Sequence, residues 1–361
     1  MAEGFPYPIT VIAKSGTSES EEGAMRRDQR WIVAGVVVGL GVVLTLSGAV
    51  AQQKPVSLTW TAGPVGGGWY QMAGGITELI RDTTGMNIKV VPGGGTQNPP
   101  LIDKGDADVG WGLPPVLNAA WNGEDPYDKP PHGGKKMQNL RAVAGGMSIN
   151  TFHFYVGADT PFKTMDEVFK QKKAIRIAVS PVGTSDEWVF RKVLAYYNTD
   201  YKDLEVAGFK FFRGSYTEQA ANFKDRNVDA TFTFLALPGA AVTEASIGRP
   251  LRLLNFPPGL LDYLAKFGLG TGKIPKGTYP KAANADEEVV SATMGSVIVA
   301  NKNVPDDVAY ALAKAINENL ERFRKIHASL QPYQASDGPT ATGIPLHPGA
   351  EKYYREKGYL K

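Results

Sequence analysis

Apolar and polar positions alternate along the chain in a way that predicts strands and helices in turn. Strand-like runs end near glycine or serine and lead into segments with helical spacing. The strand candidates are 57–63, 88–94, 107–112, 175–180, 209–214 and 228–234, and the helix candidates are 70–81, 186–197, 215–225 and 304–327. This order is typical of an α/β fold with parallel strands.

A weak internal repeat divides the chain into two similar halves. The stretch "GPVGGGWYQM" at 63–72 resembles "SPVGTSDEWVF" at 180–190, and both follow a predicted strand. Farther on, Asp108 and Asp229 each stand at the start of another predicted strand. Two similar half-structures predict two lobes. The β-rich segments 140–159 and 289–303 are then candidates for the crossings between the lobes, with a cleft between them.

The N-terminal region has the pattern of an export signal. Basic residues at 26–30 precede an apolar run over 31–46, and "AVA" follows at 49–51. This pattern predicts a signal peptide over 1–51, with translation starting at Met1 or at Met25, and a periplasmic mature chain. The alternative is a retained membrane anchor, because the stretch from Trp31 to Val50 is just long enough to span a bilayer.

Composition and charge narrow the function classes. The chain is 43% hydrophobic and 21% charged, contains no cysteine and carries a formal net charge of +3. Disulfides and thiolate chemistry are therefore excluded. The basic residues form no stripe that would indicate nucleic acid as a partner.

Motifs for catalysis and cofactors are missing. The glycine stretch after the first strand continues into Trp69 and Tyr70 rather than the Lys-Ser of a phosphate loop, and it does not fit the dinucleotide fingerprint. The four histidines are isolated, and no G-x-S-x-G pentad occurs. We therefore expect neither an enzyme nor a bound cofactor or metal.

The first glycine stretch fits a small anion held by the backbone. Gly66, Gly67 and Gly68 let a ligand approach the main chain, and the N–H groups at the following helix start bind an anion without a basic side chain. A tight turn without ligand is the alternative. Trp69 and Tyr70 suit a cleft wall or a core equally well.

Two further loops and one arginine offer similar chemistry. "PGGGTQN" at 92–98 presents Thr96 and Asn98, and "PVGTSDE" at 181–187 contains a capping pattern from Thr184 to Glu187. Arg213, at a strand end, is able to pair with a carboxylate or to remain solvated at the surface.

At these loops the chain resembles the TAXI family of extracytoplasmic solute receptors, which serve tripartite ATP-independent periplasmic (TRAP) transporters. The resemblance runs from about residue 56 to the C-terminus. Four motifs carry it in order: "TAGPVGGGWYQMAGGITELI", "GGGTQNPPLIDKGDADVGWG", "IRIAVSPVGTSDEW" and "IPLHPGAEKYYREKGYLK". It implies a type II periplasmic-binding-protein fold, with two α/β lobes, a hinge and a central cleft. It also implies a small organic anion, such as an acidic amino acid or dicarboxylate, and TRAP permease subunits as partners.

The resemblance and the residue patterns together give a set of ligand-binding candidates. These are Gly67, Gly68, Trp69, Tyr70, Thr96, Asn98, Trp111, Gly183, Thr184, Ser185, Arg213, Phe234 and Pro238. The chain departs from the family at Thr96, at Pro99-Pro100, at "WGLPP" (111–115) and at the bulky Trp69. These departures predict a reshaped and more apolar pocket wall.

The predicted division places residues 52–153 and 298–361 in lobe I and residues 154–297 in lobe II. Two other functions share this fold. One is a membrane-anchored sensor domain, which would keep the N-terminal apolar segment, and the other is an enzyme.

Overall fold

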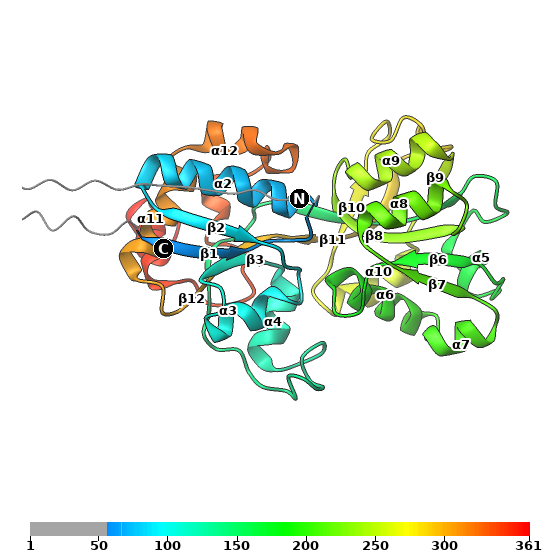
Figure 1. The fold of residues 1–361 in the computed structure, drawn as a ribbon, viewed down its shortest axis with the longest axis horizontal. Coiled ribbons are helices and arrows are strands. Elements are labelled where there is room, and N and C mark those ends of the chain that lie inside the picture. Colours follow the sequence, from blue (N-terminus) through cyan, green and yellow to red (C-terminus); the bar gives the residue numbers. More distant parts are fainter. Residues whose placement is uncertain (1–55, 66) are drawn as a thin grey trace, which may run out of the picture. The chain divides into compact units, whose positions relative to one another are not determined.

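The computed structural model describes residues 56–65 and 67–361. The predicted signal peptide, 1–51, lies outside the described residues, as does Gly66. Among the described residues, no helix combines the length and the apolar character needed to span a membrane. The described chain folds around two β-sheets with helices on their faces (Figure 1).

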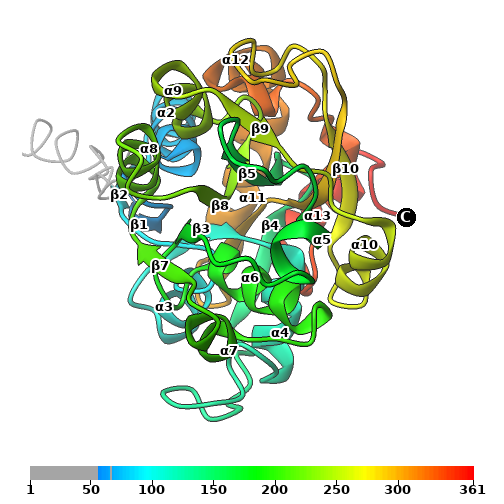
Figure 2. The ribbon, with the colours of Figure 1, turned by 90° about the vertical axis from the view of Figure 1, so that its right-hand side faces the viewer.

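The first sheet has the strand order β2-β1-β3-β12-β4. Its strands are β1 (Ser57–Thr61), β2 (Asn87–Val91), β3 (Val109–Gly112), β4 (Leu140–Ala144) and β12 (Val297–Asn301). β1 runs parallel to β2 and β3, whereas β12 is antiparallel to β3 and β4. The associated helices are α2 (Gly68–Thr84), α3 (Asn98–Lys104), α4 (Pro114–Asn122), α11 (Asp306–Asn317), α12 (Leu320–Ile326) and α13 (Pro348–Glu356). Figures 1 and 2 show α2 and α12 on one face, with α3 and α4 on the other.

The second sheet has the order β10-β11-β5-β8-β6-β7, and β9 pairs with β5. Its strands are β5 (Ile149–Gly157), β6 (Arg176–Val179), β7 (Lys210–Arg213), β8 (Ala230–Ala236), β9 (Leu251–Leu253), β10 (Gly270–Ile274) and β11 (Val289–Gly295). Its helices are α5 (Met165–Phe169), α6 (Ser185–Tyr196), α7 (Tyr201–Val206), α8 (Tyr216–Lys224), α9 (Ala240–Gly248) and α10 (Pro258–Ala265). Figure 2 shows α8 and α9 on one side of β8, with α6 and α7 on the other.

The internal repeat is confirmed by equivalent pairs of hydrogen bonds between an aspartate and the backbone of a neighbouring strand. In the first sheet, Asp108 Oδ2 accepts a 2.7 Å hydrogen bond from Thr59 N, and Asp108 N donates to Thr59 O at 3.0 Å. In the second, Asp229 Oδ2 accepts from Arg176 N at 3.0 Å, and Asp229 N donates to Arg176 O at 2.7 Å. The parallel strands are also ordered alike, β2-β1-β3 and β7-β6-β8. Equivalent loops from the two halves therefore leave equivalent strand ends.

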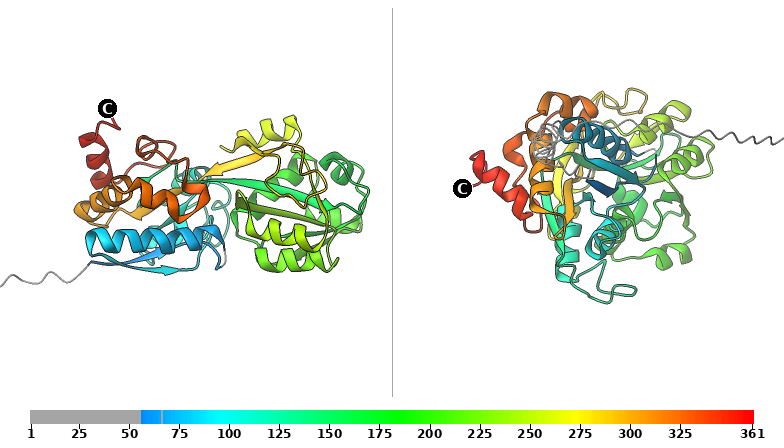
Figure 3. Two further views of the ribbon diagram at one scale, coloured as in Figure 1. Left: turned by 90° about the horizontal axis from the view of Figure 1, so that it is seen from above. Right: turned by 60° about the vertical axis from the view of Figure 1, so that its left-hand side comes forward.

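Two segments carry the chain between the sheets, as the sequence predicts. The first joins β4 to β5, and the second joins β11 to β12 through Ser296. β5 and β11 lie side by side as an antiparallel pair (Figure 3, left). Hydrogen bonds from Met147 N to Ser296 O, 3.1 Å, and from Ser296 N to Ser148 O, 2.8 Å, link the two crossings. The predicted lobe boundaries fall inside β5 and beside the start of β12. The division into two moving lobes remains a prediction.

The packing of α2 illustrates why the sequence folds this way. Its buried residues include Met72, Ile76, Leu79 and Ile80, which recur at the spacing of one helical face. The helix ends at Gly85, whose φ of 74° places it in the left-handed region and lets its N–H bond Arg81 O.

The prediction of one long helix over 304–327 is wrong. The structure has α11 up to Asn317 and a separate α12 from Leu320. Asn317 and Asn319 turn their side-chain amides back to the carbonyls of Ala313 and Ala315, at 2.7 and 2.8 Å. Asparagine side chains that bond the backbone in this way compete with the helical ladder, which explains the break.

Candidate functional site

A cavity of about 550 Å³ lies where the repeated half-structures meet. It is lined by the loops after β1, β2, β6 and β7, together with the end of β8 and the start of β5. The lining residues are Pro64, Gly67, Gly68, Trp69, Pro92, Gly93, Gly94, Gly95, Gln97, Asn150, Ser180, Pro181, Thr184, Ser185, Asp186, Arg213, Gly214, Ser215, Tyr216, Glu218, Phe234, Leu235 and Ala236. Its size suits a small-molecule ligand.

The loop after β1 brings the start of α2 to the cavity. The N-cap, Gly67, has extended backbone angles (φ −83°, ψ 156°), and no side-chain cap or first-turn acid is recorded at this end among the described residues. The first N–H groups of a helix have no intrahelical carbonyl partner. Gly68 and Trp69 therefore present backbone donors at the positive end of the helix dipole, where an anion is stabilised.

Trp69 connects this loop to the second crossing. Its Nε1 donates to Ser296 Oγ at 3.0 Å, and its ring stacks on Trp111 with centroids 5.8 Å apart. Trp111 Nε1 in turn donates to Trp69 O at 3.0 Å. Ser296 Oγ also accepts from Asn150 Nδ2 at 3.1 Å and lies 2.9 Å from Ser148 Oγ. A side chain on the cavity wall is thus bonded to the segment about which the two halves would move.

The loop after β2 is held from within by Asn98. Its Oδ1 accepts from Gly94 N at 2.9 Å and from Thr61 Oγ1 at 2.8 Å, and its Nδ2 donates to Ala62 O and Trp111 O, both at 2.8 Å. Its side chain is fully buried. Asn98 therefore shapes the glycine loop.

The loop after β6 carries a buried acid. Thr184 caps α6, because its Oγ1 accepts from Glu187 N at 3.4 Å. The second bond of the predicted capping box, from the Thr184 backbone N–H to the Glu187 carboxylate, does not form. The Glu187 carboxylate pairs instead with Arg191 at 3.3 Å. Asp186 is 2% exposed and accepts a hydrogen bond from Ser180 Oγ. Burial raises the pKa of Asp186, and hydrogen bonds from Ser180 and Thr184 oppose that rise.

The loop after β7 contributes Arg213 and the start of α8. Arg213 lies over the ring of Tyr201 at 4.3 Å, and its NH1 is 4.0 Å from Glu187 Oε1. The predicted capping box of α8 is present: Ser215 Oγ accepts from Glu218 N at 3.4 Å, and Glu218 Oε2 accepts from Ser215 N at 2.7 Å. The Glu218 carboxylate thus accepts a hydrogen bond from the backbone N–H at the start of α8.

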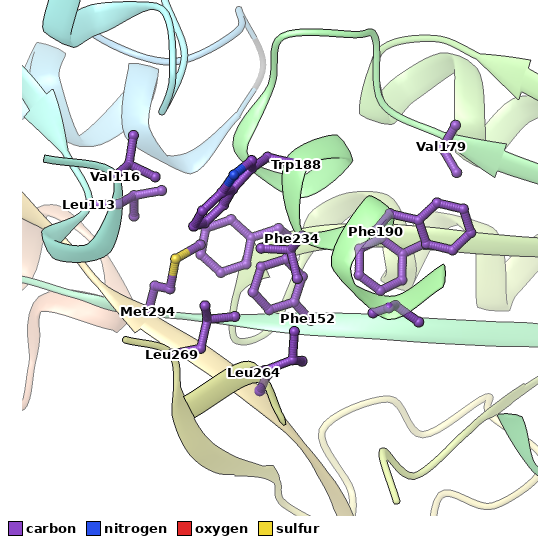
Figure 4. Packing of buried hydrophobic residues seen from close by; sticks show 14 of the residues in the cluster. Leu113, Val116, Phe152, Val179, Trp188, Phe190, Phe234, Leu264, Leu269 and Met294 are labelled. Atoms are coloured by element: carbon purple, nitrogen blue, oxygen red, sulfur yellow. The ribbon is translucent and has the colours of Figure 1, made fainter. Parts of the chain in front are cut away.

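The rest of the cavity wall is largely apolar and merges with the core. Phe234 stacks on Phe152 with centroids 4.2 Å apart, and Leu235 and Ala236 follow it along β8. Figure 4 shows Phe234 beside Trp188, with Leu113 and Val116 on the other side of Trp188. One buried apolar cluster, with members from both sheets, contains Phe152, Phe234, Trp188, Leu113 and Val116, whereas Leu235 belongs to a second cluster.

Polar contacts also join the two halves beside the cavity. Asp125, in the loop after α4, accepts from Trp188 Nε1 at 2.7 Å and from Lys192 Nζ at 2.8 Å, both on α6. The side chain of Lys192 is 9% exposed, and burial lowers its pKa while Asp125 opposes this. Thr96 Oγ1 donates to Gly183 O, which joins the second and third loops.

The structure brings some of the predicted site residues together and separates others. Gly67, Gly68, Trp69, Thr184, Ser185, Arg213 and Phe234 line the cavity. Pro238 lines a neighbouring cavity of about 260 Å³. Behind the lining lie Tyr70, Thr96, Asn98, Trp111 and Gly183, which pack or bond in support of the loops. Ligand contact at any of these residues remains a prediction.

Sequence reasoning missed several lining residues. They include Gln97, Asn150, Asp186, Tyr216 and Leu235. Asp186 stands inside "PVGTSDE", the third candidate loop, directly before Glu187. An acid in the first turn of a helix that starts at a candidate loop is a signal that the sequence carries. Asn150 carried no such signal, since it is the second residue of strand β5. In the part of the chain that the structure describes, no cluster of three His, Asp or Glu side chains is arranged to hold a metal ion.

Residues 60–358 match the NMT1-like family. The chain belongs to the NMT1-like family. Among solved structures, the periplasmic binding protein BugD is 13% identical to this NMT1-like chain, with a TM-score of 0.50. The match covers 86% of this chain and 99% of BugD. A protein described as a periplasmic transporter is 14% identical over 85% of this chain and 94% of its own, with a TM-score of 0.48. A TctC solute-binding protein from Polaromonas is 14% identical over 85% and 97%, with a TM-score of 0.42.

The likeness to BugD bears on the fold of the NMT1-like chain. Both have the mixed α/β architecture, and the match covers nearly all of BugD. The predicted periplasmic-binding-protein fold, with two sheets and helices on their faces, is confirmed.

Proposed function

We propose that the chain is an extracytoplasmic solute receptor that binds an organic carboxylate in the 550 Å³ cavity. The observation that carries the proposal is the convergence of equivalent loops from two repeated half-structures on one cavity, with the uncapped start of α2 at its wall. A ligand that touches both halves only when they are closed stabilises the closed form by its differential affinity.

The finer parts of the proposal come from the sequence. The glycine-loop motifs resemble the TAXI receptors, which supports a TRAP permease as the membrane partner. The basic, apolar and "AVA" segments of 26–51 support export to the periplasm. The ligand classes typical of such receptors are acidic amino acids and dicarboxylates. A binding role also fits the cavity chemistry, because the lining acids Asp186 and Glu218 and the hydroxyls of Ser180 and Thr184 are engaged in capping and loop-holding bonds.

A thermal-shift screen of organic acids tests the receptor function. A ligand of the native state raises the melting temperature by mass action, and at 100 times its Kd contributes about 2.7 kcal/mol. Gly68→Val is the informative variant, since a Cβ at position 68 would lie an ordinary 3.6 Å from His327 Nε2 while the added methyls crowd the start of α2. We expect it to fold and to lose binding. If no organic acid shifts the wild-type melting temperature at millimolar concentration, the proposal is wrong.

Mass spectrometry of the exported protein tests its location. A mature N-terminus at Gln52 supports a free periplasmic receptor. Retention of the apolar segment at 31–46 would support the anchored sensor instead.

A further inference from the structure

We propose that the ligand of this cavity is a monocarboxylic acid with an apolar body, rather than a dicarboxylate or an acidic amino acid. The inference rests on the proposed carboxylate-receptor function and narrows its substrate class. It follows from a comparison of the helices that begin at the cavity and of the charges around it.

Four helices begin at the cavity wall, and they differ in what occupies their N-termini. α8 holds its own carboxylate, because Glu218 Oε2 accepts from Ser215 N at 2.7 Å and from Ser215 Oγ at 2.8 Å. α6 has Asp186 and Glu187 in its first turn and is capped by Thr184. A second anion at either place would meet a carboxylate already present, and like charges at such short range repel.

The start of α3 also offers an anion few backbone donors, but for a different reason. Pro99 and Pro100 stand in its first turn, and proline has no backbone N–H. The N–H of Asn98 already donates to Gly94 O at 2.9 Å. The first turn of α3 thus offers an anion no free backbone donor at Asn98, Pro99 or Pro100.

α2 differs from these three helices. Of the described helices that start at this cavity, it combines an N-cap without a side-chain bond, a first turn without acid, and residues with backbone N–H groups. The donors of Gly68 and Trp69 therefore suit one carboxylate. The adjoining smaller cavity, at the start of α9, is itself lined by the acid Glu244.

The charged residues of the lining also favour a ligand with a single carboxylate. Among the described lining residues, Asp186 and Glu218 are acidic and Arg213 is basic. Arg213 is already drawn toward Glu187 and Tyr201, with NH1 3.5 Å from the Tyr201 hydroxyl. A dicarboxylate would therefore place its second charge in an acidic surrounding with one partly engaged cation.

The apolar part of the lining is suited to an apolar body. Trp69, Phe234, Leu235, Pro64 and Pro181 line the cavity, whose volume of about 550 Å³ exceeds what a small dicarboxylate fills. Burying apolar ligand surface against these residues favours binding. A carboxylate at the start of α2 would direct the remainder of the ligand along this wall.

The test compares two acids of equal chain length. Octanoate has one carboxylate and suberate has two, and 3-phenylpropionate and glutamate serve as a second pair. We expect titration calorimetry on the mature chain to show at least about tenfold tighter binding of octanoate than of suberate, which is 1.4 kcal/mol. We expect 3-phenylpropionate likewise to exceed glutamate.

Two variants examine the cause of the selectivity. Glu218→Gln removes an exposed lining charge and should reduce the preference for octanoate about threefold by strengthening suberate binding. Asp186→Asn should act in the same direction, and Glu218→Gln keeps the test open if the buried variant does not fold. If suberate or glutamate binds as tightly as its partner, the monocarboxylate inference is wrong and the receptor function stands. If none of the four binds, and no other organic acid does, the receptor function itself is wrong.

Discussion

Trp69 Nε1 donates a 3.0 Å hydrogen bond to Ser296 Oγ, which lies 227 residues farther along the chain in the crossing between β11 and β12. The same oxygen accepts from Asn150 Nδ2, so both of its lone pairs are used and its proton is directed to Ser148 Oγ. One hydroxyl therefore ties the cavity wall to both crossings. A movement of the two halves must preserve this cluster or break it as a unit.

Ser296→Ala should destabilise the protein by about 2–3 kcal/mol, because it leaves the partly buried donor of Trp69 and the buried donor of Asn150 without their acceptor. Ser148→Ala is the matched control, since it removes one partner and leaves the other two in place; we expect a loss of about 1 kcal/mol. Urea unfolding followed by circular dichroism measures both. Equal losses in the two variants would show that Ser296 has no central role.

Asp125→Asn should destabilise the contact between the loop after α4 and α6. The change leaves Lys192, 9% exposed, without its anion at 2.8 Å. Removing one partner of a buried pair costs 3–5 kcal/mol, and the 39% exposure of Asp125 reduces this to about 2 kcal/mol. Asp128→Asn, an exposed position in the same loop, is the control and should cost less than about 0.5 kcal/mol. Denaturant midpoints that coincide for the two variants would contradict the prediction.

Gly95→Ala should impair closure of the two halves and weaken binding of octanoate at least about tenfold, which corresponds to 1.4 kcal/mol. A Cβ at this position would lie 2.7 Å from Ser185 Oγ and 2.9 Å from Leu113 Cδ1, closer than real contacts allow. Gly94→Ala is the neighbouring control, because its Cβ would approach the flexible end of Gln97 at 3.3 Å. Small-angle scattering with saturating octanoate should show a smaller radius for Gly94→Ala than for Gly95→Ala. Wild-type affinity in Gly95→Ala would refute the steric argument.

His153 should make the stability fall as the pH is lowered from about 6.5 to 4. Complete burial lowers its pKa from 6.5 to about 4, and Nε2 lies 2.7 Å from the Tyr279 hydroxyl. In this window the unfolded chain binds a proton that the folded chain does not, so stability is lost on acidification, by up to about 2–3 kcal/mol. His153→Gln should show a shallower dependence of the unfolding free energy on pH between 7 and 4.5. Identical slopes in variant and wild type would assign the acid sensitivity to other groups.

The sequence predicted the elements whose local signals agree with their surroundings. The Ser215–Glu218 capping box forms with both of its bonds, and the aspartates at 108 and 229 occupy equivalent places in the two sheets. The break between α11 and α12 escaped prediction because Asn317 and Asn319 do not interrupt the apolar spacing. Their effect depends on which way their amides turn, and the pattern of residue types does not encode that direction.

The loops of the candidate site were predictable, whereas the roles of their side chains were not. Ligand contact by Thr96 and Asn98 remains a prediction; in the structure, the amide of Asn98 bonds within the fold and Thr96 bonds Gly183 of the third loop. A polar residue beside a glycine loop suits either task, and its direction is decided by strand ends that are distant in sequence, such as Ala62 and Trp111. Asp186 was overlooked because its neighbours Thr184 and Glu187 explained the motif as a cap.

The side-chain amide of Asn98 also has a kinetic consequence. Because it holds Gly94 through Oδ1 and two strand-end carbonyls through Nδ2, the second loop is already ordered before any ligand arrives. A loop ordered in advance adds little entropic cost to complex formation. Association rates should then be governed by how often the two halves separate, and the residence time of the ligand by the same opening event.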